Sequence, residues 1–157
     1  MKHHRKALLL WGAALALSAC GCGEVQPGSE SREESALSHQ LVEVRWEDHT
    51  VTYRLNGSPA AESLAEQLPL TVEMEDFSTN EKIFYPPQPL DTEHTPTARR
   101  GAGTLAYYQP WGDVVLFYGD YRENPSLFEL GQAVSGGELV EEITGTVTIA
   151  AAETEQK

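Results

Sequence analysis

Cysteine, long apolar runs and positive charge are all scarce in this sequence of 157 residues. Its two cysteines, Cys20 and Cys22, lie one residue apart, so the rest of the chain has no disulfide framework. The longest apolar run, 7–17, is too short for a membrane-spanning helix, which needs roughly 20 residues. The chain has 11 Lys and Arg against 24 Asp and Glu, a formal net charge of −13. Because nucleic-acid binding depends on basic side chains that neutralise phosphates, this charge excludes nucleic acid as a partner.

The residue patterns of common catalytic and metal sites are also missing. The histidines have no metal-ligand spacing, no serine lies in a nucleophile elbow, and Gly101 and Gly103 alone do not make a phosphate-binding loop. We therefore predict no metal, no cofactor and no catalytic residue.

The N-terminus has the features of a secretory signal. Lys2, Arg5 and Lys6 precede the short apolar run, and small residues follow it. The stretch Leu17-Ser-Ala-Cys20 resembles the lipobox of bacterial lipoproteins. This resemblance implies cleavage after Ala19 and a diacylglyceryl group on the Cys20 sulfur, and two acyl chains make a durable anchor. We expect an exported, lipid-anchored envelope protein, on the periplasmic face or at the cell surface.

Lipidation of Cys20 leaves Cys22 without a partner in the chain. The sequence leaves open whether Cys22 stays free, pairs between chains or is acylated too. Composition divides the chain into a signal peptide (1–19), a flexible, acidic tether rich in Ser and Gly (20–40), one domain (41–150) and a disordered tail (151–157).

The domain reads as mainly β. Alternating residues in 41–46 and 50–55 predict a hairpin, and Ser58-Pro59 predicts the start of a helix that ends before Pro69. Further strands are expected at 70–75, 81–85, 103–108, 113–118, 127–130 and 146–150, and a second short helix is expected at 136–143. The stretch 86–103 has no period, which is typical of a functional or mobile loop.

This order of elements resembles the bacterial cyclophilin-like fold proteins over about residues 42–150. The similar segments are Leu68-Pro-Leu-Thr-Val-Glu-Met74, Gly103-Thr-Leu-Ala-Tyr-Tyr108, Val114-Val-Leu-Phe-Tyr118, Glu129-Leu-Gly131 and Gly145-Thr-Val-Thr-Ile149. The resemblance implies a closed eight-stranded β-barrel capped by two short helices.

True cyclophilins use an arginine on the strand after the first helix, within a Phe-His-Arg motif, and a Gln-Gly-Gly-Asp stretch follows. The matching strand here, 70–76, has neither. The nearest basic residue is Lys82, and Arg54 lies before the helix. No catalytic residue is therefore carried over from that family.

Aromatic side chains gather in the second half of the domain. Strand alternation places Tyr107 opposite Tyr108 and Phe117 opposite Tyr118, so one ring of each pair must leave the barrel interior. In this fold the face of the central strands forms the ligand groove. The candidate groove residues are Tyr107, Tyr108, Trp111, Phe117, Tyr118, Arg99 and Arg100.

The sequence thus favours a lipid-anchored envelope protein that binds an extended peptide or small molecule without catalysis. Two alternatives stay open, a divergent peptidyl-prolyl isomerase and a structural interaction module of the envelope.

Overall fold

The computed structural model describes residues 40–99 and 101–153. The signal peptide, Cys20, the tether up to residue 39, Arg100 and the tail from residue 154 lie outside the described residues. The predictions made for them therefore rest on sequence alone.

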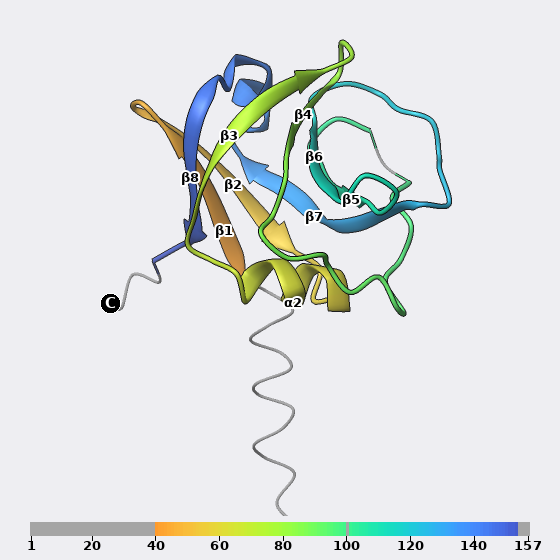
Figure 1. Ribbon diagram of the computed structural model, residues 1–157. Coiled ribbons are helices and arrows are strands. Elements are labelled where there is room, and N and C mark those ends of the chain that lie inside the picture. The colour runs from red at the N-terminus through yellow and green to blue at the C-terminus, as the bar shows by residue number, and fades with distance from the viewer. Residues whose placement is uncertain (1–39, 100, 154–157) are drawn as a thin grey trace, which may run out of the picture.

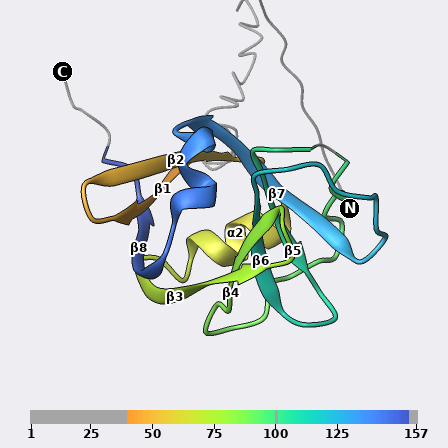
Figure 2. The same cartoon turned by 90° about the horizontal axis from the view of Figure 1, so that it is seen from above.

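The described chain forms a closed antiparallel β-barrel (Figure 1). The strands are β1 (Leu41–Trp46), β2 (His49–Leu55), β3 (Leu70–Phe77), β4 (Glu81–Phe84), β5 (Thr104–Tyr108), β6 (Asp113–Phe117), β7 (Leu127–Ser135) and β8 (Gly145–Ala151). Around the barrel their order is β1-β2-β7-β5-β6-β4-β3-β8. Seen from above in Figure 2, β1 and β2 lie on the side of the barrel away from β4 and β6. The predicted eight-stranded, mainly β fold is confirmed.

Two short helices lie at opposite ends of the barrel (Figure 1). Helix α2 (Pro59–Ala65) begins as predicted: the Ser58 hydroxyl accepts a hydrogen bond from the backbone N–H of Ala61, and proline occupies the first turn. The second, η1 (Gly137–Glu142), is a 3-10 helix, and its Val140 is fully buried. Both helices shield core residues that the strands alone would leave open to water.

The barrel interior holds the main hydrophobic core. In the β1–β2 hairpin the alternating residues face inward as the sequence indicates, with Val44, Val51 and Tyr53 almost fully buried. Burial raises the pKa of the Tyr53 phenol far above its usual value, and the Tyr53 hydroxyl has no hydrogen-bond partner within the described residues. A polar atom without a partner is thus enclosed in an otherwise apolar core.

The long segment between β4 and β5 is packed against the barrel. Its Leu90 is buried, the Thr95 hydroxyl accepts from the Ala60 N–H at 3.1 Å, and the Asp91 N–H donates to the Ser63 hydroxyl at 3.1 Å. A polar, proline-rich sequence gave no sign of these contacts, because they are made through backbone groups and helix side chains. This segment lies against helix α2 and bonds to the start of β7 through a bridge between Thr97 and Phe128.

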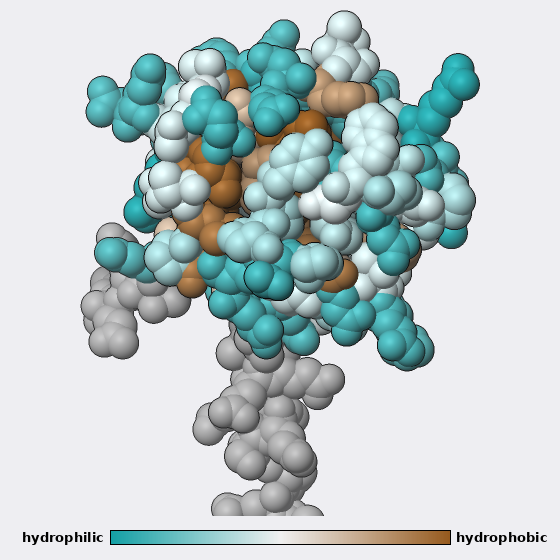
Figure 3. Space-filling view, in the orientation of Figure 1, coloured by the Kyte–Doolittle hydropathy of each residue, from teal (hydrophilic) through white to brown (hydrophobic). Residues whose placement is uncertain are grey.

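The surface is largely polar. Figure 3 shows hydrophilic residues over most of the face in view, with hydrophobic residues gathered in recesses between them. Within residues 40–99 and 101–153, no helix has the length and apolar character needed to cross a membrane.

A candidate ligand groove on the outer face of the barrel

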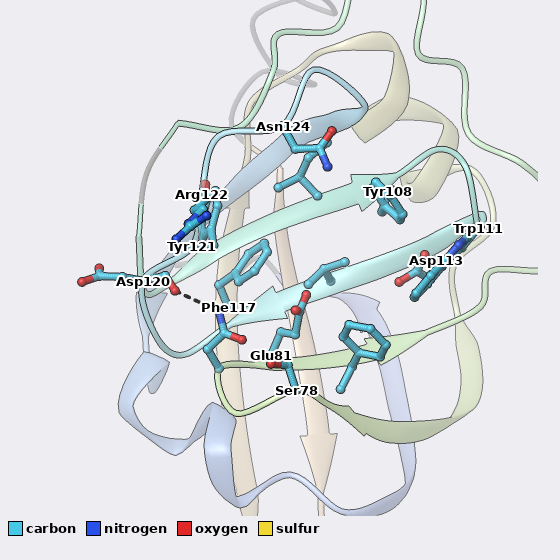
Figure 4. Close-up of a pocket in the computed structure, with 14 residues that line it drawn as sticks. Ser78, Glu81, Tyr108, Trp111, Asp113, Phe117, Asp120, Tyr121, Arg122 and Asn124 are labelled. Atoms are coloured by element: carbon cyan, nitrogen blue, oxygen red, sulfur yellow. Dashed lines mark hydrogen bonds between the residues drawn. The ribbon is translucent and has the colours of Figure 1, made fainter.

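A groove of about 600 Å³ lies on the outside of the barrel over β4, β6 and β5 (Figure 4). This volume is in the range of small-molecule and peptide-side-chain sites. Its walls come from the end of β3, the turn before β4, the β5–β6 turn and the β6–β7 loop. The lining residues are Phe77, Ser78, Asn80, Glu81, Tyr108, Trp111, Asp113, Val115, Phe117, Asp120, Tyr121, Arg122, Asn124 and Leu127.

The floor of the groove is a second, smaller hydrophobic cluster. Strand alternation turns Val115 and Phe117 of β6 outward, next to Ile83 of β4, while Val114 and Leu116 point into the barrel. Leu127 at the start of β7 completes the floor. Strand β6 is therefore apolar on both faces, which explains its continuous apolar run in the sequence.

Three aromatic rings form one end of the groove. Trp111 packs edge-on against Phe77 at 5.2 Å between ring centroids and against Tyr108 at 5.5 Å. A tight turn holds Trp111 there, because the Tyr108 carbonyl accepts from the N–H of Gly112, whose φ of +75° favours glycine. Trp111 is 55% exposed, the most exposed of the large hydrophobic residues in the described chain.

The other end of the groove is formed by the β6–β7 loop. Tyr121 stacks on Phe117 at 3.9 Å, and Arg122 and Asp120 lie beside it (Figure 4). The Asn80 side-chain amide donates to the Asp120 carbonyl at 2.8 Å, which ties the loop to the β3–β4 turn. The two walls of the groove are thus held together across it.

Two carboxyl groups, of Glu81 on β4 and Asp113 on β6, point into the groove (Figure 4). Asp113 is only 2% exposed, and its Oδ1 has no hydrogen-bond partner among residues 40–99 and 101–153. Burial raises the pKa of Asp113 more than the bond from its own backbone N–H lowers it. Burial, and then the charge of Asp113, raises the pKa of Glu81. Neither carboxylate forms an ion pair within the described residues.

These raised pKa values predict that the domain becomes more stable as the pH falls toward about 4, the usual carboxyl pKa. Between that value and the raised pKa values the folded state binds more protons than the unfolded state, so the free energy of unfolding decreases as the pH rises. Urea unfolding at a series of pH values measures this slope. The Asp113→Asn variant should show a flatter slope, and parallel curves for variant and wild type would contradict the assignment.

The structure separates the candidate groove residues into two sets. Tyr108, Trp111 and Phe117 line the groove. Tyr107 and Tyr118 do not: Tyr107 is buried in the main core, and Tyr118, which follows β6, is partly buried and packs against that core.

The structure describes one of the two candidate arginines. Arg99 is exposed and does not line the groove, and Arg100 lies outside the described residues.

Sequence reasoning missed the two carboxyl groups, Phe77, Tyr121 and Arg122. Glu81 and Asp113 each open a strand that is otherwise buried, a position where a charged residue is uncommon. That signal could have found them, but only the register of β4 against β6 places them on one face. Within the described residues no group of three or more His, Cys, Asp or Glu side chains could hold a metal ion.

The comparisons with known proteins agree with this fold. A hypothetical protein from Archaeoglobus fulgidus, known from its solution structure, is similar over 73% of this chain and 95% of its own, with a TM-score of 0.55 and 19% sequence identity. At this identity the likeness concerns the fold alone. No curated protein matches the chain. The family model described as the Cyclophilin-like family matches residues 44–151. The chain therefore belongs to the Cyclophilin-like family.

Proposed function

We propose that this protein is a lipid-anchored envelope protein whose barrel binds an extended peptide or a small molecule in the outer groove, without catalysis. The observation that carries the proposal is the groove itself: an apolar floor, exposed aromatic rings at the rim and a few polar groups directed inward. Such a combination is typical of ligand sites. The exposed ring of Trp111 offers a stacking surface for a proline or sugar ring.

Binding can be tested with the purified full chain and a panel of blocked, proline-containing pentapeptides. We expect saturable shifts of backbone amide resonances in the β5–β6 turn and the β6–β7 loop. The proposal fails if the panel and a matched set of small sugars leave these resonances unchanged, or if shifts gather at another face of the barrel.

One observation favours the alternative of a prolyl isomerase. Arg122 lines the groove beside Phe117 and Tyr121, so a guanidinium and aromatic rings share one site. Strand β3, where true cyclophilins carry their arginine, has none, and Lys82 is buried in an ion pair with Asp76. In an assay of peptidyl-prolyl cis-trans isomerisation we expect the wild-type protein not to accelerate the reaction. Acceleration that is lost on Arg122→Ala would establish the isomerase instead.

The anchor rests on Cys20, and the neighbouring cysteine supplies a matched control. We expect Cys20→Ser to abolish lipid attachment and leave the precursor uncleaved, because the lipid bond requires the thiol. Cys22→Ser should be lipidated and processed like the wild type. Radiolabelled palmitate incorporation and the mass of the native protein measure both outcomes. Equal labelling of the wild type and the Cys20→Ser variant would contradict the anchor.

A further inference from the structure

Asp113 is an unusual residue for the wall of a ligand groove. Its side chain is almost completely buried, it faces the groove, and its Oδ1 has no hydrogen-bond partner in the described part of the chain. A buried carboxylate without a partner is costly, and in most proteins such a group is paired or hydrogen-bonded. The free structure therefore leaves an acceptor that a donor from outside would satisfy.

The surroundings of Asp113 are suited to a positive charge. Glu81 adds a second carboxyl group from the neighbouring strand, and the two groups are close enough for the charge of one to raise the pKa of the other. The rings of Trp111, Tyr108 and Phe77 stand at the same end of the groove. Aromatic faces attract cations, and most strongly where water is displaced.

A bare metal ion fits this place poorly. Calcium and magnesium need six or more oxygen ligands, whereas among the described residues Asp113 alone supplies a carboxyl group at this end of the groove, because Glu81 pairs with Phe117. Aromatic rings contribute no such ligands, whereas they do contact the alkyl chain and the charge of an organic cation.

We infer that this end of the groove binds an organic cation, a primary ammonium or guanidinium group carried by the ligand, which donates to Asp113 Oδ1 and packs against Trp111 and Tyr108. The inference rests on the proposed function and adds the chemical class of the ligand. Arg122 and Asp120 lie at the far end of the groove, beyond Phe117, and so leave this end to Asp113, with Glu81 in the middle of the groove beside Phe117 (Figure 4).

The test uses blocked pentapeptides that differ at one position, which is lysine, acetyl-lysine or norleucine, and n-butylammonium as a free amine. Wild-type protein should bind the lysine peptide about tenfold more tightly than the acetyl-lysine peptide. Asp113→Asn and Glu81→Gln should each reduce this preference, and the control Glu141→Gln, on η1 and outside the groove lining, should keep it. Resonance shifts caused by butylammonium would show that the isolated ammonium group is enough for binding. Shifts caused only by the lysine peptide would show that the peptide is needed as well.

A second readout is the dependence of peptide affinity on pH. The titratable groups that face the groove are Glu81, Asp113, Asp120, Arg122, Tyr108 and Tyr121. The lysine peptide should lose affinity as the pH falls toward about 4, because carboxyl groups with raised pKa values are then protonated, and the norleucine peptide should not. Equal binding of the three peptides at the groove would overturn the inference while the proposed function stands. If no peptide and no amine perturbs the groove, both fail.

Discussion

Replacing Trp111 with alanine is expected to weaken ligand binding at the groove at least tenfold and to leave stability nearly unchanged. The indole is 55% exposed and its ring contacts are edge-on with Phe77, itself 38% exposed, and with Tyr108, so its loss removes little buried area. A ligand that covers it would bury most of that ring, and truncation of such an anchor typically costs about 2 kcal/mol of binding free energy. Titration calorimetry and thermal unfolding of the same samples measure both effects.

Tyr85→Ala is the matched control for this variant. Tyr85 is also a large exposed ring, 50% accessible, but it follows β4 and does not line the groove. Its replacement should leave the affinity within about twofold of wild type, a change worth less than about 0.5 kcal/mol. Equal losses of affinity in the two variants would mean that exposed aromatic rings bind the ligand nonspecifically. A Trp111→Ala variant that binds like the wild type would show that the indole does not contact the ligand.

Gly131→Ala is expected to destabilise the fold by about 3 kcal/mol or more. Gly131 of β7 pairs with Leu55 of the neighbouring strand β2. A Cβ at position 131 would lie 2.2 Å from the Arg54 carbonyl oxygen. Backbone on both sides cannot move without opening the ladder between β2 and β7. Because β7 also pairs with β5 and supplies Leu127 to the groove floor, the strain should reach the ligand site as well. Urea unfolding gives the free energy.

Gly101→Ala controls for the loss of a glycine as such. Its Cβ would meet the Asp120 carboxylate, the end of an exposed and flexible side chain, which can move aside at little cost. The change in unfolding free energy should stay within about 0.5 kcal/mol. A Gly131→Ala variant as stable as Gly101→Ala would show that β2 and β7 are not packed as closely as described.

Much of the fold could be predicted, because amphipathic alternation and turn residues are local signals. The β1–β2 hairpin and the capped start of α2 follow directly from them. Strand β7 was predicted to end at Leu130 but continues to Ser135. Its second half lacks clean alternation for two reasons. Position 131 must be glycine because the backbone of β2 lies too close for a side chain, and the pairing of β2 with β7 contains a bulge.

The site was harder to predict than the fold. Alternation shows that Tyr107 and Tyr108 face opposite ways, but not which of the two faces outward, and that choice is set by the closure of the barrel. Asp113 and Glu81 are brought to one face by strand pairing between segments about 30 residues apart, which no local pattern encodes.

The central claim is that the ligand binds on the outside of the barrel, over β4, β6 and β5. Intermolecular nuclear Overhauser effects between a bound pentapeptide and the aromatic side chains test it most directly. We predict contacts from the peptide to the rings of Trp111, Tyr108 and Phe117. Contacts confined to a second hollow around Gly136 and Glu138, with none to these three rings, would contradict the account.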